Sequence, residues 1–116
     1  MDKVISLKMN TQFQKLYKKG KSCVAPSCVI YVRRNGLGYN RLGITAGKKI
    51  GNAVVRNRAK RRLRELFRIR LPYMKTGFDF VAVARMRTAS APYEKLAADF
   101  DGLLKTAGVL CDAPCD

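Results

Sequence analysis

Hydrophobic residues near the start of the chain recur at the spacing of an α-helix. Phe13, Leu16 and Tyr17 stand at i, i+3 and i+4, so their side chains share one helical face. Asn10 precedes them as a suitable N-terminal cap, and Gly20 follows them as a suitable C-terminal cap. The pattern predicts a short helix between these two caps.

Two longer segments show the same periodicity. In a projection down a helix axis, the apolar side chains of residues 54–70 fall within an arc of about 80°. They are Val55, Ala59, Leu63 and Leu66, with Phe67 at the edge. Residues 91–107 carry a second apolar stripe, and Pro92 suits the first position of a helix there. We predict a helix in each segment.

β-branched and aromatic residues alternate between the first two predicted helices and again after the second. The sequences SCVIYVRR (residues 27–34), RLGITAG (41–47) and FDFVAVAR (78–85) each predict a strand whose side chains point alternately to the two faces of a sheet. Pro26 interrupts the apolar run before the first of them, and NGLGYN (35–40) has the composition of a hairpin turn. The predicted element order is α, two or three strands, α, strand, α.

This order, in a chain of 116 residues, predicts one compact domain. We expect residues 1–109 to form a single α/β domain and residues 110–116 to be a disordered tail. No segment is long and apolar enough to span a membrane, and the N-terminal sequence lacks the apolar core of a secretory signal. We therefore expect a cytoplasmic protein without a membrane partner.

The charge distribution narrows the class of partner. The chain has 24 lysine and arginine residues against 8 aspartate and glutamate residues, a formal net charge of +16. Between Lys3 and Arg64 lie 17 of the 24 bases and no acid. Such a field repels itself unless an anionic partner neutralises it. Nucleic acid is the partner that this distribution favours, ahead of an anionic membrane.

The far side of the second predicted helix gathers polar and basic residues in an arc of about 100°. They are Asn57, Lys60, Arg61, Arg64 and Arg68, with Arg56 and Arg58 at the two borders. Like charges at i, i+3 and i+4 destabilise a helix, so this face indicates a ligand that neutralises them. Arginine predominates, and its guanidinium fork binds phosphate bidentately. Before the helix, Lys48 and Lys49 stand between two glycines, in a connection that lets the backbone approach a ligand closely.

The four cysteines indicate no catalytic site and no clear metal site. Cys23, Cys28, Cys111 and Cys115 have the spacings C-x4-C and C-x3-C, which fit structural zinc sites only loosely, and the chain contains no histidine. We expect reduced thiols without a metal. The glycines and lysines around residue 48 do not match a phosphate-binding loop, so we expect no nucleotide cofactor.

The same composition argues against a protein that cleaves its substrate alone. The chain has no histidine, and its central region lacks the carboxylates that hold catalytic metals or act as a general base. A structural RNA-binding protein such as a ribosomal protein remains the main alternative, because it would share the size and the charge. A helix-turn-helix DNA-binding protein fits less well, since no well-formed helix precedes the glycine turn.

The segment KKIGNAVVRNRAKRRLRELFR (residues 48–68) closely resembles the arginine-asparagine-arginine signature of the protein subunit of bacterial ribonuclease P. The flanking sequences extend the likeness. LKMNTQFQKLYKKGKS (7–22) is similar to the first helix of that family, RLGITAGKKIGNAV (41–54) to its strand into the signature, and FDFVAVAR to its later strand. The resemblance covers most of residues 5–105.

The resemblance implies a small α/β two-layer sandwich, with a mixed sheet of about four strands, three helices and a left-handed βαβ crossover. General principles alone favour a right-handed crossover. The resemblance also implies that the protein assists a catalytic RNA, which removes the 5′ leader from precursor tRNA with Mg²⁺ bound mainly by the RNA. The protein alone would be inactive. Its implied partners are the ribonuclease P RNA and precursor tRNA.

The resemblance and the charge pattern together suggest two surfaces. The residues expected to face the ribonuclease P RNA are Lys48, Lys49, Asn52, Arg56, Asn57, Arg58, Lys60, Arg61, Arg64 and Arg68. Those expected to hold the leader are Phe13, Tyr17, Tyr31, Arg33, Arg41 and Arg85. No residue is expected to be catalytic or to bind a metal. Aromatic rings beside cations suit single-stranded RNA, but rings at helical spacing also commonly fill a core, and the sequence leaves both interpretations open.

Overall fold

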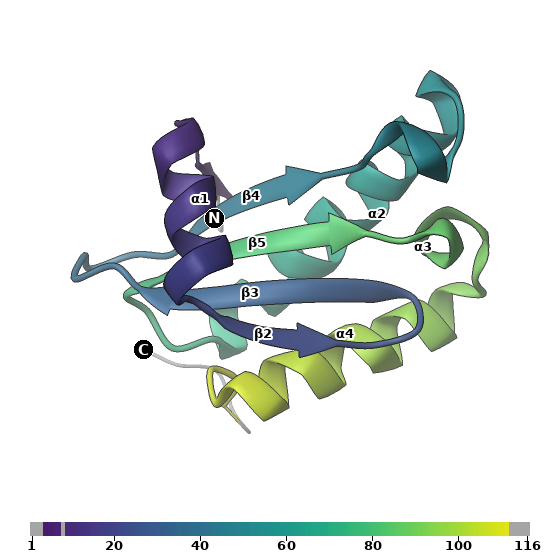
Figure 1. The fold of residues 1–116 in the computed structure, drawn as a ribbon. Helices are drawn as coiled ribbons and strands as arrows, with labels where there is room; N and C mark the ends of the chain where they lie inside the picture. Colours follow the sequence, from purple (N-terminus) through teal and green to yellow (C-terminus); the bar gives the residue numbers. More distant parts are fainter. Residues whose placement is uncertain (1–3, 8, 112–116) are drawn as a thin grey trace.

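The computed structural model describes residues 4–7 and 9–111. Within these residues five strands form one sheet in the order β1-β4-β5-β3-β2 (Figure 1). The strands are β1 Ile5–Ser6, β2 Lys21–Val24, β3 Cys28–Arg34, β4 Arg41–Thr45 and β5 Phe78–Ala84. β1, β4 and β5 are parallel to one another, whereas β3 is antiparallel to both of its neighbours, β5 and β2.

Helices cover both faces of this sheet. The α-helices of the described chain are α1 Asn10–Lys19, α2 Ala53–Arg70, α3 Met86–Ser90 and α4 Tyr93–Ala107, and the 3-10 helices are η1 Lys48–Ile50 and η2 Leu71–Tyr73. Figure 1 shows α1 in front of the sheet, α2 behind it and α4 along the β2 edge. The mixed α/β class and the three main helices agree with the prediction.

The core forms two clusters, one on each face of the sheet. The larger cluster packs α2 and α4 against the inward residues of four strands, among them Ile30, Val32, Leu42, Phe80 and Ala82. The smaller cluster lies under α1 and consists of Leu7, Leu16 and Val81, with Phe13 and Tyr31 packed against it. The period-2 alternation of the strands therefore sorts their side chains between the two layers as predicted.

The chain passes from β4 to β5 through α2, and the crossover is left-handed. β4 and β5 are parallel neighbours, with Leu42 opposite Phe80. In Figure 1 both strands point to the same side, β4 stands above β5, and the connecting helix α2 lies behind the sheet. That arrangement has the handedness that the resemblance implies, against the general preference for right-handed crossovers.

The N-terminal region differs from the prediction in two details. β1 adds a fifth strand, and two residues are too short to show an alternation in the sequence. α1 begins at Asn10, so Asn10 is not its cap; the preceding Met9 takes that position, and its N–H donates to the Oε1 of Gln12 at 3.2 Å. Gly20 follows the helix as predicted but has an extended backbone, with φ −78°. Crowding explains why a glycine occupies this position, because a Cβ there would lie 2.5 Å from the carbonyl oxygen of Leu16.

The C-terminal end of the described chain packs beside η2. Leu110 forms an isolated bridge with Met74, and the N–H of Cys111 donates to the carbonyl of Tyr73 at 2.6 Å. These contacts continue two residues beyond the expected domain limit. Residues 112–116 lie outside the described residues, so the disordered tail stays a prediction.

The cysteines follow the prediction in part. Cys23 and Cys28 are free thiols, and both are buried. Cys111 is disulfide-bonded, so the expectation of a reduced thiol was wrong at this position. Cys115 lies outside the described residues.

Candidate nucleic-acid interface

The connection before α2 is shaped by the cap of that helix. The Oδ1 atom of Asn52 accepts a hydrogen bond from the N–H of Val55 at 3.0 Å. Gly51 has a φ of 155°, and a Cβ there would stand 2.9 Å from the Cβ of Val55. Lys48 and Lys49 are exposed on η1, directly before this turn. The turn therefore fixes the start of α2 and presents two lysines beside it, and the side-chain oxygen of Asn52 already has a partner.

α2 has the two faces that its periodicity predicts. Ala59, Leu63, Leu66 and Phe67 are buried, and Val55 is half-buried. The outer face is exposed and consists of Asn57, Arg58, Lys60, Arg61, Arg64 and Arg68. Burying each large apolar side chain contributes roughly 1.5–3 kcal/mol, whereas a like-charge pair at i, i+4 costs only about 0.2–0.5 kcal/mol. The buried face can therefore hold a row of like charges in place.

Arg56 lies on the inner border of α2 rather than on its exposed face. The residue is half-buried, and its Nε atom is buried without a hydrogen-bond partner among the described residues. Helical geometry explains this position, because seven residues advance the helix by about two turns and bring Arg56 to within about 20° of Leu63. A buried donor without an acceptor costs about 1–3 kcal/mol. Of the predicted RNA-facing arginines, Arg56 is thus the one closest to the core.

Arg68, at the far end of the exposed face, is partly neutralised by its own helix. Its Nε and Nη2 atoms donate to the two carboxylate oxygens of Glu65 at 3.1 and 2.5 Å. These hydrogen bonds hold the pKa of Glu65 below its ordinary value. Arg61 and Arg64 have no such ion pair with the described residues. The uncompensated charge of the face is therefore concentrated near its middle.

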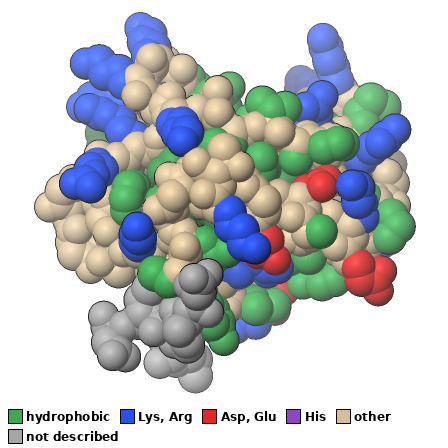
Figure 2. Space-filling view, turned by 90° about the horizontal axis from the view of Figure 1, so that it is seen from below, with side chains coloured by type: hydrophobic (Ala, Val, Ile, Leu, Met, Phe, Trp, Pro, Cys, Tyr) green, Lys and Arg blue, Asp and Glu red, His purple; other side chains and the backbone are tan. Residues whose placement is uncertain are grey.

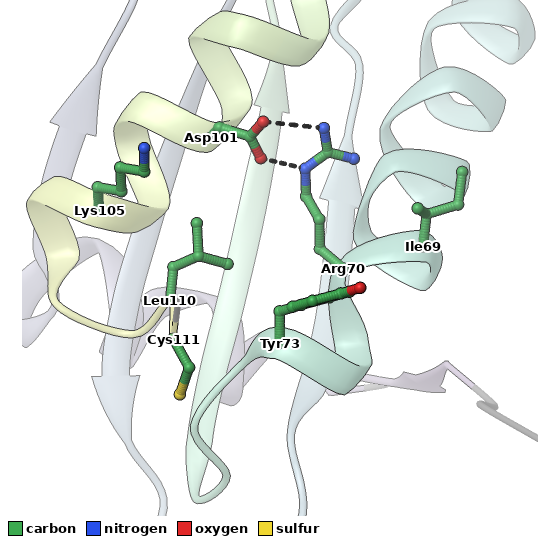
Figure 3. A pocket seen from close by; sticks show the side chains of 7 residues that line it. All are labelled: Ile69, Arg70, Tyr73, Asp101, Lys105, Leu110 and Cys111. Atoms are coloured by element: carbon green, nitrogen blue, oxygen red, sulfur yellow. Dashed lines mark hydrogen bonds and ion pairs between the residues drawn. The ribbon is translucent and has the colours of Figure 1, made fainter. Parts of the chain in front are cut away.

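Two further arginines of α2 serve packing. The Nη1 atom of Arg62 donates to the carbonyl of Thr88 at 2.9 Å. Arg70 forms a bidentate ion pair with Asp101 of α4, at the rim of a pocket of about 370 Å³ (Figure 3). The basic run in the sequence does not distinguish these residues from their neighbours. Their positions against α3 and α4 decide their role.

On the other face of the sheet, α1 brings the three predicted rings together. Phe13 is half-buried above Gly43, where a Cβ would lie 2.5 Å from its ring atoms. Tyr17 is 43% exposed and meets Tyr31 edge to face, with ring centroids 5.0 Å apart. Phe13 and Tyr31 also pack against the core under α1, whereas Tyr17 is open to solvent. Two of the three rings thus contribute to the core, and a role of the rings in binding single-stranded RNA stays a prediction.

Beyond these rings α1 leaves the sheet open (Figure 1). Val24 is 65% exposed there, and Val29, Thr45 and Val83 on the same face are half-buried. Arg85 follows the end of β5 at this side of the sheet. It is exposed, and its Nη1 atom donates to the carbonyl of Ala25 at 3.3 Å. Rings, an open apolar surface and a cation therefore adjoin one another.

Arg33 and Arg41 lie on the opposite side of α1 from this open surface, where they line a hollow together with Lys15. The Nε and Nη2 atoms of Arg41 donate to the two carboxylate oxygens of Asp79 at 2.8 and 2.7 Å. The hydrogen bonds from Arg41 to Asp79 raise the pKa of Arg41 above its ordinary value. Arg33 is paired with Asp79 in the register of β3 and β5, and it is half-buried. Of these two predicted leader contacts, Arg41 has its charge balanced within the fold.

Acidic and basic side chains are unevenly distributed over the molecule. Figure 2, seen from below in the orientation of Figure 1, shows acidic side chains among basic ones, whereas the largest groups of lysine and arginine stand at the upper edges of the view. α4 carries Glu94, Asp99 and Asp101. In the part of the chain that the structure describes, no three histidine, cysteine, aspartate or glutamate side chains gather to hold a metal ion. None of the described helices has the length and apolarity to cross a membrane.

Comparison with known proteins gives one consistent result. A family model described as Ribonuclease P matches residues 1–108. The ribonuclease P protein component of Natranaerobius thermophilus is 39% identical over 110 residues, which cover 95% of this chain and 96% of that protein. The corresponding protein of Thermoanaerobacter sp. strain X514 is 43% identical over 94 residues, covering 81% of each chain.

Solved structures agree with the sequence relatives. The RNase P protein of Staphylococcus aureus superposes with a TM-score of 0.83 at 34% identity, covering 93% of this chain and 99% of that one. The RNase P protein of Thermotoga maritima gives a TM-score of 0.78 at 32% identity, covering 87% and 96%. The chain therefore belongs to the ribonuclease P protein family and is a protein component of this tRNA-processing endoribonuclease.

Proposed function

We propose that the chain binds the catalytic RNA of ribonuclease P through the exposed face of α2 together with η1. The observation that carries this proposal is the row of Asn57, Lys60, Arg61 and Arg64, held outward by a buried apolar face and without ion pairs to the described residues. α2 has 18 residues, so at about 1.5 Å per residue its exposed face can reach several successive phosphates. Lys48 and Lys49 extend the row at its N-terminal end.

The second part of the proposal concerns the substrate. The rings of Phe13, Tyr17 and Tyr31, the open sheet beside them and Arg85 would hold the 5′ leader of precursor tRNA as a single strand. Stacking of bases on aromatic rings tolerates any base, because every base has a π face. The exposed ring of Tyr17 and the uncovered apolar surface near Val24 support this use. The balanced charge of Arg41 favours a positioning role for that residue over a direct contact.

In this proposal the RNA performs the cleavage, and the protein alone is inactive. The Mg²⁺ ions of the reaction are bound mainly by the RNA, which provides phosphate oxygens that a hard cation prefers. The chemistry of the protein supports this division, because its exposed face is strongly basic and its described residues include no cluster of metal ligands. Processing of tRNA by such a complex would take place in the cytoplasm.

Reconstitution tests the proposal directly. Purified protein should leave precursor tRNA intact, and addition of a bacterial ribonuclease P RNA at low Mg²⁺ should give leader removal that neither component achieves alone. Cleavage by the protein without RNA would overturn the assignment of catalysis to the RNA. Absence of any stimulation by the protein would favour a structural RNA-binding protein instead.

A further inference from the structure

Helix α1 separates two unlike surfaces on its face of the sheet. Phe13 and Tyr17 lie on one side of the helix, toward the open apolar surface. On the other side, Lys15 lines a hollow of about 250 Å³ together with sheet residues. The lining residues from the sheet and from the loop after β3 include Arg33, Arg34, Asn35, Arg41 and Asp79. The basic side of α1 is thus turned away from its aromatic side.

A second hollow continues the first around the end of β3. It has a volume of about 450 Å³ and is lined by the two loops that meet there, residues 35–40 and 75–77. Arg34 lines both hollows, and Lys75 lines the second. The guanidinium carbon of Arg34 lies 5.9 Å from the ring centroid of Phe78, which supports the side chain from one side. The two hollows therefore form one continuous surface that passes Arg34.

This surface carries positive charge without internal balance. Lys15, Arg34 and Lys75 are exposed and Arg33 is half-buried. The acid among the lining residues is Asp79, which is only 7% exposed and accepts hydrogen bonds from Arg41 and from Asn35 at 2.9 Å. Within the described residues none of the four cations forms an ion pair. We call Lys15, Arg33, Arg34 and Lys75 the cationic groove.

We propose that the cationic groove binds the sugar-phosphate backbone of the leader, in the part that lies 5′ of the segment stacked on the aromatic side of α1. This inference rests on the proposed leader site and extends it. Four cations around an open hollow suit a flexible polyanion. The groove offers ammonium and guanidinium groups rather than exposed rings, so we expect it to bind phosphates and not bases.

The direction in which the leader would run follows from the positions of the two ends of β4. That strand begins at Arg41, beside the cationic groove, and leads at its other end to η1 and the start of α2, where the catalytic RNA is proposed to dock. Figure 1 shows the two ends on opposite sides of the molecule. The leader nucleotides nearest the cleavage site would enter from the η1 side and meet the aromatic rings first. Nucleotides farther from the cleavage site would then reach the cationic groove.

A leader-length series tests this inference. Holoenzyme reconstituted from the full chain and ribonuclease P RNA is titrated with precursor tRNAs whose leaders are lengthened one nucleotide at a time. The double variant Arg34→Gln/Lys75→Gln should bind short-leader substrates as tightly as the wild type does. Its affinity for long-leader substrates should be severalfold lower than that of the wild type. The slope of log affinity against log salt should fall by about 0.7 for each phosphate that the groove no longer neutralises, for long leaders only. Lys95→Gln/Lys105→Gln removes the same charge from α4 and should behave like the wild type at every length.

The outcomes separate the possible partners. Equal losses for long-leader, short-leader and leaderless tRNA, or weaker binding of the catalytic RNA itself, would overturn the inference in favour of a contact to another part of the complex. An affinity that does not rise with leader length in the wild type would overturn it as well. Lys15→Gln, on α1, should repeat the effect if the first double variant folds poorly. Phe13→Ala tests the proposed leader site separately, because it should already weaken binding of short leaders.

Discussion

The ring of Phe13 occupies the space that a side chain at position 43 would need. A Cβ on Gly43 would lie 2.5 Å from both the Cε1 and the Cζ atoms of that ring and 3.3 Å from the Cδ1 atom of Leu7. The close approach of α1 to β4 therefore depends on a glycine in the middle of a strand, where glycine is otherwise unfavourable. It also holds the ring over β4, against the small core cluster on which Tyr31 packs as well.

Gly43→Ala should displace Phe13 and weaken leader binding. The holoenzyme carrying this variant should lose affinity for precursor tRNA but not for mature tRNA, by roughly 1–3 kcal/mol, the value of one base stacked on a ring. Binding titrations with both tRNAs measure the difference.

The matched variant is Phe13→Ala, which removes the ring itself. If Gly43→Ala acts through the ring, the double variant should lose no more affinity for precursor tRNA than Phe13→Ala alone. The effects of two substitutions that act through the same contact are not additive. Additive losses would show that Gly43 acts elsewhere. Equal losses for precursor and mature tRNA would return Phe13 to a purely structural role.

Residues of α2 show what a sequence pattern can predict. The buried and exposed faces were predictable, because burial on one side imposes a periodicity on the apolar residues of the helix. The roles of Arg62 and Arg70 were not, since their partners Thr88 and Asp101 stand on helices whose position against α2 is set by the whole fold. A run of like residues carries no information about which member meets a neighbour.

The α1 face of the sheet shows where sequence reasoning ends. The pair Arg41–Asp79 joins β4 to β5 across 38 residues, and only the strand register places the two side chains opposite each other. The cationic groove likewise takes Lys15 from a helix, Arg34 from a strand and Lys75 from a loop. The alternation of β3 predicted that Tyr31 and Arg33 share a face, but it could not show that a helix would divide that face in two.

Removal of an arginine from the middle of the exposed face of α2 should weaken RNA binding without unfolding the protein. Arg61→Ala and Arg64→Ala should each lower the affinity for ribonuclease P RNA and reduce the slope of log affinity against log salt by about one. Both side chains are exposed, so the free energy of unfolding should change by less than about 0.5 kcal/mol. Filter binding over a range of salt concentrations measures the slope. An unchanged slope would show that these residues do not contact phosphates.

Asp79→Asn should destabilise the fold through its ion pair with Arg41. The side chains of Arg41 and Asp79 are 22% and 10% exposed, so loss of the carboxylate leaves a poorly solvated guanidinium. We expect the free energy of unfolding to fall by roughly 3 kcal/mol, the low end for a broken buried pair. Glu65→Gln breaks the pair with Arg68, whose members are both 48% exposed, and should leave stability nearly unchanged because solvent screens both charges. Urea denaturation of both variants compares the two pairs, and equal effects would contradict the expected role of burial.

Alkaline pH should destabilise the protein through the thiol of Cys28. Burial raises the pKa of this thiol from 9.0 to about 11. Between these two values the unfolded chain releases the thiol proton while the folded chain keeps it, so the free energy of unfolding falls as the pH rises. The contribution of the protonated thiol to the free energy of unfolding is fully present below pH 9. Each unit of the pKa shift corresponds to about 1.36 kcal/mol, so the loss approaches roughly 2.7 kcal/mol near pH 11. Urea denaturation at a series of pH values measures the decline in the wild type and in Cys28→Ala. Lysine and tyrosine residues titrate in both proteins, so the difference between the two slopes of unfolding free energy against pH isolates the effect of the thiol. Parallel curves would show that Cys28 does not cause the decline.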